Sequence, residues 1–133
     1  MNATFYRRMF VISALWNISG GVILVLFMRQ VFALSNVEVP DPPVWYYCWI
    51  ALFVTFGIGI LSVYRDMDAT RAFVPIGMIG KISFSIIYVY FFFAYPNQVP
   101  SLVLLGVVGD LGFCVLYGAF LRFAAEMRVS DHH

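Results

Sequence analysis

Two charged residues stand inside long apolar stretches of this sequence. Lys81 ends the run GMIGK at residues 77–81, and Asp110 ends the run GVVGD at residues 106–110. Ionisable groups in such stretches are costly to place in lipid, so they usually face a protein interior, pair with one another and mark functional sites. A lysine and an aspartate that meet could form a structural ion pair, hold the polar part of a ligand or move a proton. Which of these applies depends on the elements that carry the two residues.

The composition is that of an integral membrane protein. Of the 133 residues, 62% are hydrophobic and only 11% are charged, and the mean hydropathy of +0.88 lies well outside the range of soluble domains. The net charge is +1, and no basic run is long enough to bind a nucleic acid. The cysteines, Cys48 and Cys114, belong to neither a C-x-x-C motif nor a Cys/His cluster, so no metal site is predicted.

Four apolar stretches are each long enough for a helix to cross about 30 Å of hydrocarbon at ~1.5 Å per residue. Short connections that contain proline or aspartate separate them. We therefore predict an all-α fold, with a single transmembrane domain over residues 1–133 that forms an antiparallel four-helix bundle. The predicted spans are residues 9–34, 44–64, 72–95 and 101–125.

The arginines are unevenly distributed between the two ends of the predicted bundle. Six of them lie before the first span, between the second and third spans, or at the end of the fourth, whereas the opposite side has only Arg29. The positive-inside rule therefore places both termini in the cytoplasm. Four aromatic residues at the start of the second span agree with this, because Trp and Tyr concentrate at membrane interfaces. The six arginines are Arg7, Arg8, Arg65, Arg71, Arg122 and Arg128, and the aromatic residues are Trp45, Tyr46, Tyr47 and Trp49.

Lys81 and Asp110 lie at the same depth in this arrangement. Lys81 is nine residues past Ala72, the start of the third span, and Asp110 is nine residues past Ser101, the start of the fourth. At ~1.5 Å per residue each lies about 14 Å from its own end of the span, near the middle of the bilayer. The two spans are consecutive and antiparallel, so we predict that Lys81 and Asp110 form a buried ion pair.

Small and polar residues recur on one face of each predicted helix. In the third span they recur around Lys81 at spacings of three or four residues, which keeps them on one stripe, and the fourth span repeats this around Asp110. The first and second spans also carry polar residues, and we expect these stripes to face a common interior. We predict a buried polar network that could bind a ligand, formed by Lys81, Asp110, Asn17, Ser85, Tyr88, Tyr117 and Thr55. No catalytic residue is assigned.

Glycines in the four spans are predicted to serve helix packing. Small residues let helix backbones approach closely in a membrane, where dispersion contacts rather than hydrophobic burial hold helices together. The glycines given this role are Gly20, Gly21, Gly57, Gly59, Gly77, Gly80, Gly106, Gly109 and Gly112.

The positions of these residues resemble those in a known group of proteins. The motifs that carry the resemblance are Asn17 with the glycine pair at 20–21, Gly-Ile-Gly at 57–59, Gly-x-x-Gly-Lys at 77–81 and Gly-Asp-Leu-x-Phe at 109–113. They look like small uncharacterised bacterial four-helix membrane proteins, which are similar in turn to the DoxX-like assemblage. This resemblance implies a multi-pass bundle in the bacterial inner (cytoplasmic) membrane and, in DoxX-like relatives, association with a redox enzyme. No catalytic residue is carried over. The chain has no cysteine pair and no quinone motif, which argues against a direct redox role.

Three functions fit a membrane bundle with a polar interior. The first, which we expect, is a ligand- or lipid-binding protein or an accessory subunit of a larger membrane complex. Its partners would be membrane lipids, a larger complex or a second copy of the chain, and its occupant a bound lipid or a quinone-like molecule, with no other cofactor. The second is a membrane-embedded isomerase acting on a lipid, although Asp110 held by Lys81 would be a poor base. The third is a small proton-coupled transporter, but four-helix multidrug exporters use a carboxylate in the first helix, where this chain has Asn17.

Overall fold

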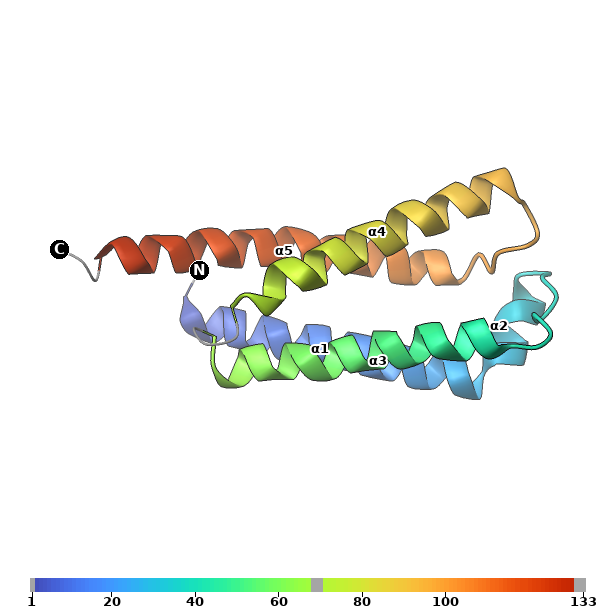
Figure 1. Ribbon diagram of the computed structural model, residues 1–133, viewed down its shortest axis with the longest axis horizontal. Coiled ribbons are helices and arrows are strands. Elements are labelled where there is room, and N and C mark those ends of the chain that lie inside the picture. Colours follow the sequence, from blue (N-terminus) through green and yellow to red (C-terminus); the bar gives the residue numbers. More distant parts are fainter. Residues whose placement is uncertain (1, 68–70, 131–133) are drawn as a thin grey trace.

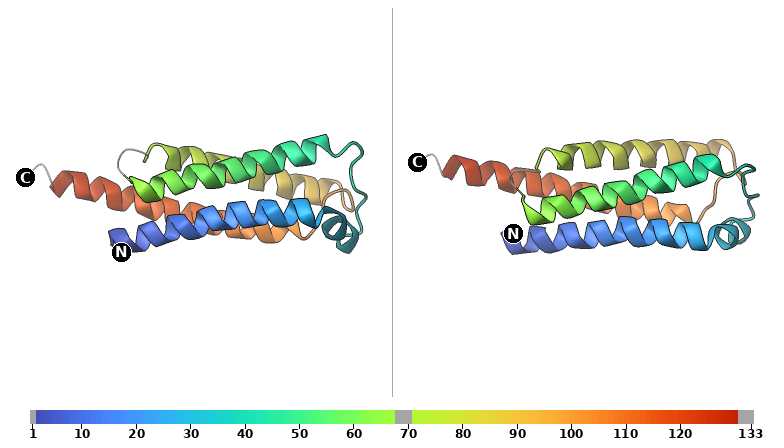
Figure 2. Two further views of the ribbon diagram at one scale, coloured as in Figure 1. Left: turned by 90° about the horizontal axis from the view of Figure 1, so that it is seen from below. Right: turned by 60° about the horizontal axis from the view of Figure 1, so that its bottom comes forward.

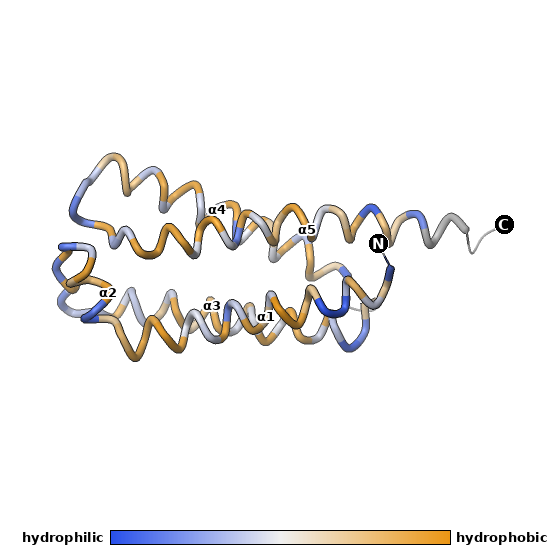
Figure 3. Tube along the Cα trace, turned by 180° about the vertical axis from the view of Figure 1, so that it is seen from behind, coloured by the Kyte–Doolittle hydropathy of each residue, from blue (hydrophilic) through white to orange (hydrophobic). Residues whose placement is uncertain are grey.

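The chain folds into helices that run back and forth between two ends. The computed structural model describes residues 2–67 and 71–130, with side chains described as far as residue 126. Four helices are long and apolar enough to cross a membrane, and Figure 3 shows hydrophobic residues along them and hydrophilic ones at their connections. The protein is therefore an all-α, multi-pass membrane protein, as predicted. Its helices are α1 (Ala3–Leu26), α2 (Met28–Leu34), α3 (Val44–Arg65), α4 (Phe73–Ala94) and α5 (Val103–Ser130), of which only α2 is too short to span.

The first and last helices differ from the predicted spans. The first begins at Ala3 instead of residue 9, because the side chain of Asn2 caps it by accepting a hydrogen bond from the Phe5 N–H at 3.0 Å. It ends before Phe27, whose backbone leaves helical geometry (φ −115°, ψ 24°), and α2 follows as a separate short helix. The last helix continues past residue 125 to Ser130. Hydropathy does not predict this extension, because a helix can continue into water beyond the membrane.

The four long helices form two antiparallel pairs. The first pair is α1 with α3 and the second pair is α4 with α5, and contacts between the pairs are fewer than contacts within them. Figures 1 and 2 show both termini and the α3–α4 connection at one end, here termed the terminal end, and α2 with the α4–α5 connection at the other, the far end. In Figure 1, α4 rises away from α3 toward the far end. Because the backbones of the two pairs approach one another less closely, side chains must fill the interface between the pairs.

Glycines bring the two helices of the first pair into close contact. A Cβ atom added at Gly57 would lie 3.0 Å from the Cβ of Asn17 and 3.2 Å from the carbonyl oxygen of Ala14. One added at Gly21 would overlap the side chain of Val54. A side chain at Gly57 would press against the backbone of α1, and one at Gly21 would displace side chains of α3.

The other glycines are approached less uniformly. Aromatic rings crowd Gly20, Gly59 and Gly109, so these positions make room for bulky side chains rather than for a neighbouring backbone. A Cβ atom added at Gly77 or Gly80 would make only ordinary contacts, the nearest at 3.6 Å or more. Close approach of helices is thus a property of the first pair more than of the second.

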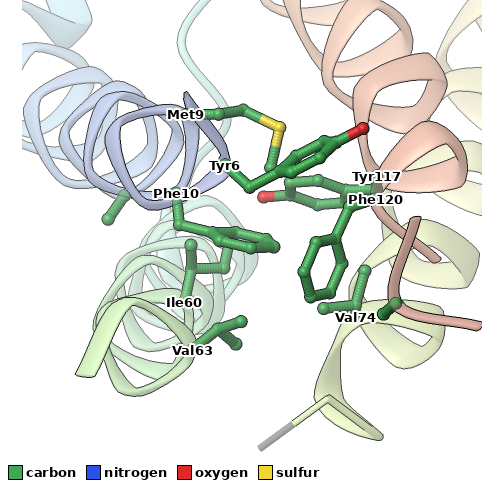
Figure 4. Close-up of a cluster of buried hydrophobic side chains, with 10 residues drawn as sticks. Tyr6, Met9, Phe10, Ile60, Val63, Val74, Tyr117 and Phe120 are labelled. Carbon is green, nitrogen blue, oxygen red and sulfur yellow. The ribbon is translucent and has the colours of Figure 1, made fainter. Parts of the chain in front are cut away.

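A core of apolar side chains, here termed the terminal core, joins the two pairs near the terminal end. All four long helices contribute to it, and its side chains point toward one another in Figure 4. The ring of Phe10 packs edge-on against Phe120, with the centroids 4.9 Å apart, and Tyr6 packs against the same ring at 5.4 Å. This core fixes the pairs to one another on one side of the bundle's middle. The residues labelled in Figure 4 are Tyr6, Met9, Phe10, Ile60, Val63, Val74, Tyr117 and Phe120.

Candidate functional site

Three polar side chains from three helices meet in the middle of the bundle. The ammonium of Lys81 in α4 forms an ion pair with the Asp110 carboxylate in α5 and donates a hydrogen bond to the side-chain oxygen of Asn17 in α1 at 3.0 Å. These side chains belong to residues that are only 6%, 2% and 1% exposed, respectively. The ion pair predicted from the sequence is therefore present, and Asn17 joins it. We refer to these three residues as the buried triad.

The buried triad lies far from both ends of the helices that carry it. Lys81 is the ninth residue of the 22-residue helix α4, and Asp110 is the eighth residue of α5. At ~1.5 Å per residue, each lies about 11 to 12 Å from the start of its helix. The hydrogen bond from Lys81 to Asn17 crosses from the second pair to the first. The triad is thus both a buried charge site and a link between the two pairs.

Aromatic rings surround the charged groups of the triad. The indole of Trp16 lies beside the Asp110 carboxylate and packs on Gly109. The Lys81 nitrogen is 5.8 Å from the ring centroids of both Phe53 and Phe113, at the limit of a cation–π contact. Two of the three ammonium N–H groups have oxygen acceptors, and the third has none among the described residues. The site therefore retains one strong hydrogen-bond donor.

Two further predicted residues make hydrogen bonds away from the triad. The Tyr117 hydroxyl is 2.5 Å from the Ser13 hydroxyl. This buried contact links α5 to α1 next to the terminal core, to which Tyr117 belongs. Ser13 is absent from the predicted site, because a single serine in an apolar run gives no distinctive signal. Tyr88 donates to the carbonyl of Pro100 at 2.6 Å, near the far end, and so ties α4 to the connection that follows it.

The last two predicted residues have no polar contact with the triad. Ser85 is buried one helical turn beyond Lys81, and its hydroxyl has no hydrogen-bond partner among the described residues. Thr55 is exposed on the surface of α3 and donates to the carbonyl of Ala51 in its own helix at 2.8 Å. The sequence-based network of seven residues thus separates into a triad, two outlying hydrogen bonds, one unpaired hydroxyl and one residue on the outer surface.

A cavity of about 140 Å³, the α3–α4 cavity, lies against the buried triad. All three triad residues line it, together with side chains of α3 and α4. Leu52, on its rim, is 64% exposed, and Gly80 is also exposed. The cavity therefore opens sideways, toward the lipid that surrounds a membrane bundle, rather than along the axis of the bundle. The apolar residues that line it include Leu52, Phe53, Phe56, Gly77, Gly80 and Phe84.

A larger cavity of about 380 Å³, the α1–α5 cavity, lies on the other side of the same aromatic side chains. It extends from Asp110 toward the far end between α1 and α5, past Leu105, which is 68% exposed. Gly106 lines it, and a Cβ atom added there, or at Gly112 further along α5, would meet no atom within 4 Å. The structure thus shows no close packing at these two predicted positions.

An aromatic wall separates the two cavities. Trp49, Phe53 and Phe84 line both of them, as does Asp110. The Trp49 ring stacks on Phe84 with the centroids 5.3 Å apart and the planes inclined by 14°, and on Phe53 at 5.9 Å and 26°. From the sequence, Trp49 belongs to a cluster that favours an interfacial belt over a ligand-binding rim, and Phe53 and Phe84 have no predicted role. Flat apolar surfaces thus stand next to a charged pair, which is the usual composition of a small-molecule site.

Metal ligands do not gather at this site. Within the described part of the chain, no three His, Cys, Asp or Glu residues lie close enough to hold a metal ion. Cys48 is exposed, and the buried Cys114 lies 3.9 Å from the carbonyl oxygen of Met78. The three polar side chains of the triad can donate and accept hydrogen bonds, pair charges or exchange a proton.

Comparison with known proteins leaves the site to be interpreted from its own geometry. No family model, no curated protein and no solved structure matches this chain. The resemblance to DoxX-like proteins stays a prediction. The functional argument therefore rests on the triad, the cavities and the helices that hold them.

Proposed function

We propose that this protein binds a membrane-soluble molecule in the α3–α4 cavity, with the polar part of that molecule against the buried triad. The proposal keeps the bacterial inner membrane that the resemblance implies, and it places both termini in the cytoplasm, following the arginine distribution. One observation carries it: the buried triad lines a cavity that opens sideways. Lys81 and Asp110 are almost fully buried by protein, yet both also line a cavity that an ion pair serving only to hold the helices together would not need.

The energetics of buried ion pairs support this reading. Removing two charges from water costs so much that their attraction often fails to yield net stability, and apolar replacements are frequently as stable. The pair of Lys81 and Asp110 is therefore weak evidence for a purely structural role. Its position at an aromatic-lined cavity favours a binding role, because binding sites combine apolar walls with a few convergent polar groups.

A pair of matched variants tests the proposal. In Gly80→Leu the new side chain would enter the α3–α4 cavity, since Gly80 lines it and a Cβ atom there would make only an ordinary contact of 3.6 Å with Phe56. In Gly112→Leu the new side chain would enter open space on α5, away from both cavities. The two variants make the same change in composition at glycines inside spanning helices.

The measurement is mass spectrometry of molecules that co-purify in a mild detergent. We expect the natural protein and Gly112→Leu to retain the same apolar molecule in about equal molar amount to protein. Gly80→Leu should lose it while remaining folded, as judged by helical circular dichroism. If all three proteins carry the same lipids in the same proportions, the cavity is not a binding site.

A further inference from the structure

The hydrogen-bonding capacity of Lys81 defines what a molecule in the α3–α4 cavity must supply. The ammonium has three N–H donors, of which Asn17 and Asp110 accept two. Among residues 2–67 and 71–126, no further oxygen or nitrogen acceptor is hydrogen-bonded to the Lys81 nitrogen. Because Lys81 lines the cavity, an oxygen atom of the bound molecule can complete its hydrogen bonding. An unsatisfied N–H in lipid is costly, so this requirement is a strong one.

Because the charges of the triad are balanced, the bound molecule must carry no charge of its own beside it. Lys81 and Asp110 already neutralise one another. A carboxylate or phosphate placed beside Lys81 would leave a net negative charge in a region of low dielectric, and an amine placed beside Asp110 would leave a net positive one. Only an uncharged head group adds an acceptor without adding a charge.

Depth excludes the head groups of ordinary phospholipids. The triad lies near the middle of the spanning helices, whereas phospholipid head groups are about 15 Å away, beyond the hydrocarbon. A molecule that reaches the triad from the surrounding lipid must carry its polar atom into the hydrocarbon. Molecules with one small uncharged oxygen group do so at low cost, and molecules with a phosphate do not.

The size of the cavity limits the head group to a few atoms. Its volume is about 140 Å³, and an apolar cavity of about 150 Å³ in another protein accommodates a benzene ring. The part of the molecule beside the triad therefore has about six non-hydrogen atoms. Any longer chain must leave the cavity past Leu52 and lie in the bilayer.

We infer that the bound molecule is a neutral amphiphile with a single alcohol or ketone oxygen and one apolar chain, held by a hydrogen bond from Lys81. This inference rests on the proposed function and specifies its ligand. It differs from the expectation for an isolated buried lysine, which would select an anion. Asp110 makes the difference, because it balances the charge of Lys81. The third N–H then favours an uncharged oxygen over an anion.

A series of twelve-carbon compounds tests this in the natural protein. The compounds are dodecan-1-ol, dodecan-2-one, dodecane, dodecanoate and dodecylammonium, with farnesol as a branched isoprenoid alcohol of the same backbone length. Binding is measured by native mass spectrometry of protein released from a non-ionic detergent. The alcohol and the ketone should bind about tenfold more tightly than dodecane, as expected for one added hydrogen bond to a charged donor. The ratio of the affinities for farnesol and dodecan-1-ol shows whether the cavity prefers isoprenoid or straight chains.

The variant Asp110→Asn reverses the preference if the charge argument holds. Removing the carboxylate leaves Lys81 as an unpaired cation, so dodecanoate should bind about tenfold more tightly than it binds the natural protein. Because the ligand series on the natural protein needs no substitution, a failure of Asp110→Asn to fold does not remove the test.

The outcomes separate this inference from the proposed function. If every compound, dodecane included, binds equally and Gly80→Leu abolishes binding, the cavity binds chains and the head-group inference is wrong. Preference of the natural protein for dodecanoate or dodecylammonium also overturns it. If no compound binds at all, the proposed function itself fails.

Discussion

The two halves of the bundle are packed differently, although the same four helices form both. Toward the terminal end, side chains from all four helices fill the space between the pairs, and Phe10 and Val63 are entirely buried. The α3–α4 cavity of about 140 Å³ lies at the depth of the triad, and the α1–α5 cavity of about 380 Å³ extends from the triad toward the far end. A further pocket of about 540 Å³ lies at the terminal end, along α5 beside Tyr6. The buried triad stands at the boundary. The comparison shows a polar site with a packed apolar core on its terminal side and a cavity that extends from it toward the far end.

Hydrogen bonds follow the same division. At the far end, Tyr46 donates to the carbonyl of Leu24 at 3.1 Å, which fastens α3 to α1 within the first pair. In the second pair, Tyr88 fastens α4 to the α4–α5 connection at the carbonyl of Pro100. Between the pairs, the described residues of the far end offer a contact between the hydroxyls of Ser35 and Ser101 at 3.5 Å, the limit of a hydrogen bond. Each pair is thus fastened internally, and the space between them can admit a molecule.

The largest effect on stability should come from disrupting the ion pair of the buried triad, which lies at the boundary between the two halves. Lys81→Met leaves Asp110 charged and unpaired, which should destabilise the protein by about 3 to 5 kcal/mol. Lys81→Met/Asp110→Leu removes both charges and should recover most of that loss. Reversible unfolding in mixed micelles measures both. Equal destabilisation of the single and double variants would show that the two residues do not depend on one another.

A smaller loss is expected from the terminal core. Phe10→Ala removes a ring that packs on Tyr117 and Phe120. In water such a change costs about 3 to 5 kcal/mol, but in lipid the transfer part of this cost is small, so we expect about 2 to 3 kcal/mol. Ile12→Ala, at a position 59% exposed in the same helix, is the control and should change stability by about 0.5 kcal/mol or less. Similar losses for the two variants would remove the distinction between core and surface.

The smallest of these effects is expected from alanine substitutions at two glycines, Gly57 in the closely packed first pair and Gly106 beside the α1–α5 cavity. Gly57→Ala would place a methyl group 3.2 Å from the Ala14 carbonyl oxygen, and the helices of the first pair should separate at a cost of about 1 to 2 kcal/mol. Gly106→Ala faces open space and should be neutral or gain up to about 1 kcal/mol from higher helix propensity. The same unfolding measurement applies. A loss at Gly106 as large as that at Gly57 would mean that the far half is closely packed.

The sequence predicts the fold and the centre of the site because both rest on strong signals. Long apolar runs give the spanning helices, and matching depth on consecutive helices brings Lys81 and Asp110 together. Asn17 follows as a polar residue on the stripe of the first span that is expected to face the common interior. The position of the ion pair depends on length and charge, which helix geometry converts directly into position.

The rest of the arrangement depends on side-chain shape, which hydropathy does not report. Apart from the polar stripes, the faces of these helices are apolar, so the sequence does not show that α1 pairs with α3 or that cavities remain between the pairs. Thr55 illustrates the limit, since its hydroxyl bonds to the carbonyl of Ala51 and can face lipid without an interhelical partner. Gly57 and Gly106 look alike in the sequence, yet only Gly57 is crowded.

The central claim is that a molecule occupies the α3–α4 cavity and accepts a hydrogen bond from Lys81. An experimental structure of the protein purified from its native membrane in a mild detergent tests it most directly. We predict non-protein density in that cavity, next to the aromatic wall, with an atom at about 3 Å from the Lys81 nitrogen. A structure in which side chains of α3 and α4 close over the ion pair and leave no such density would contradict it.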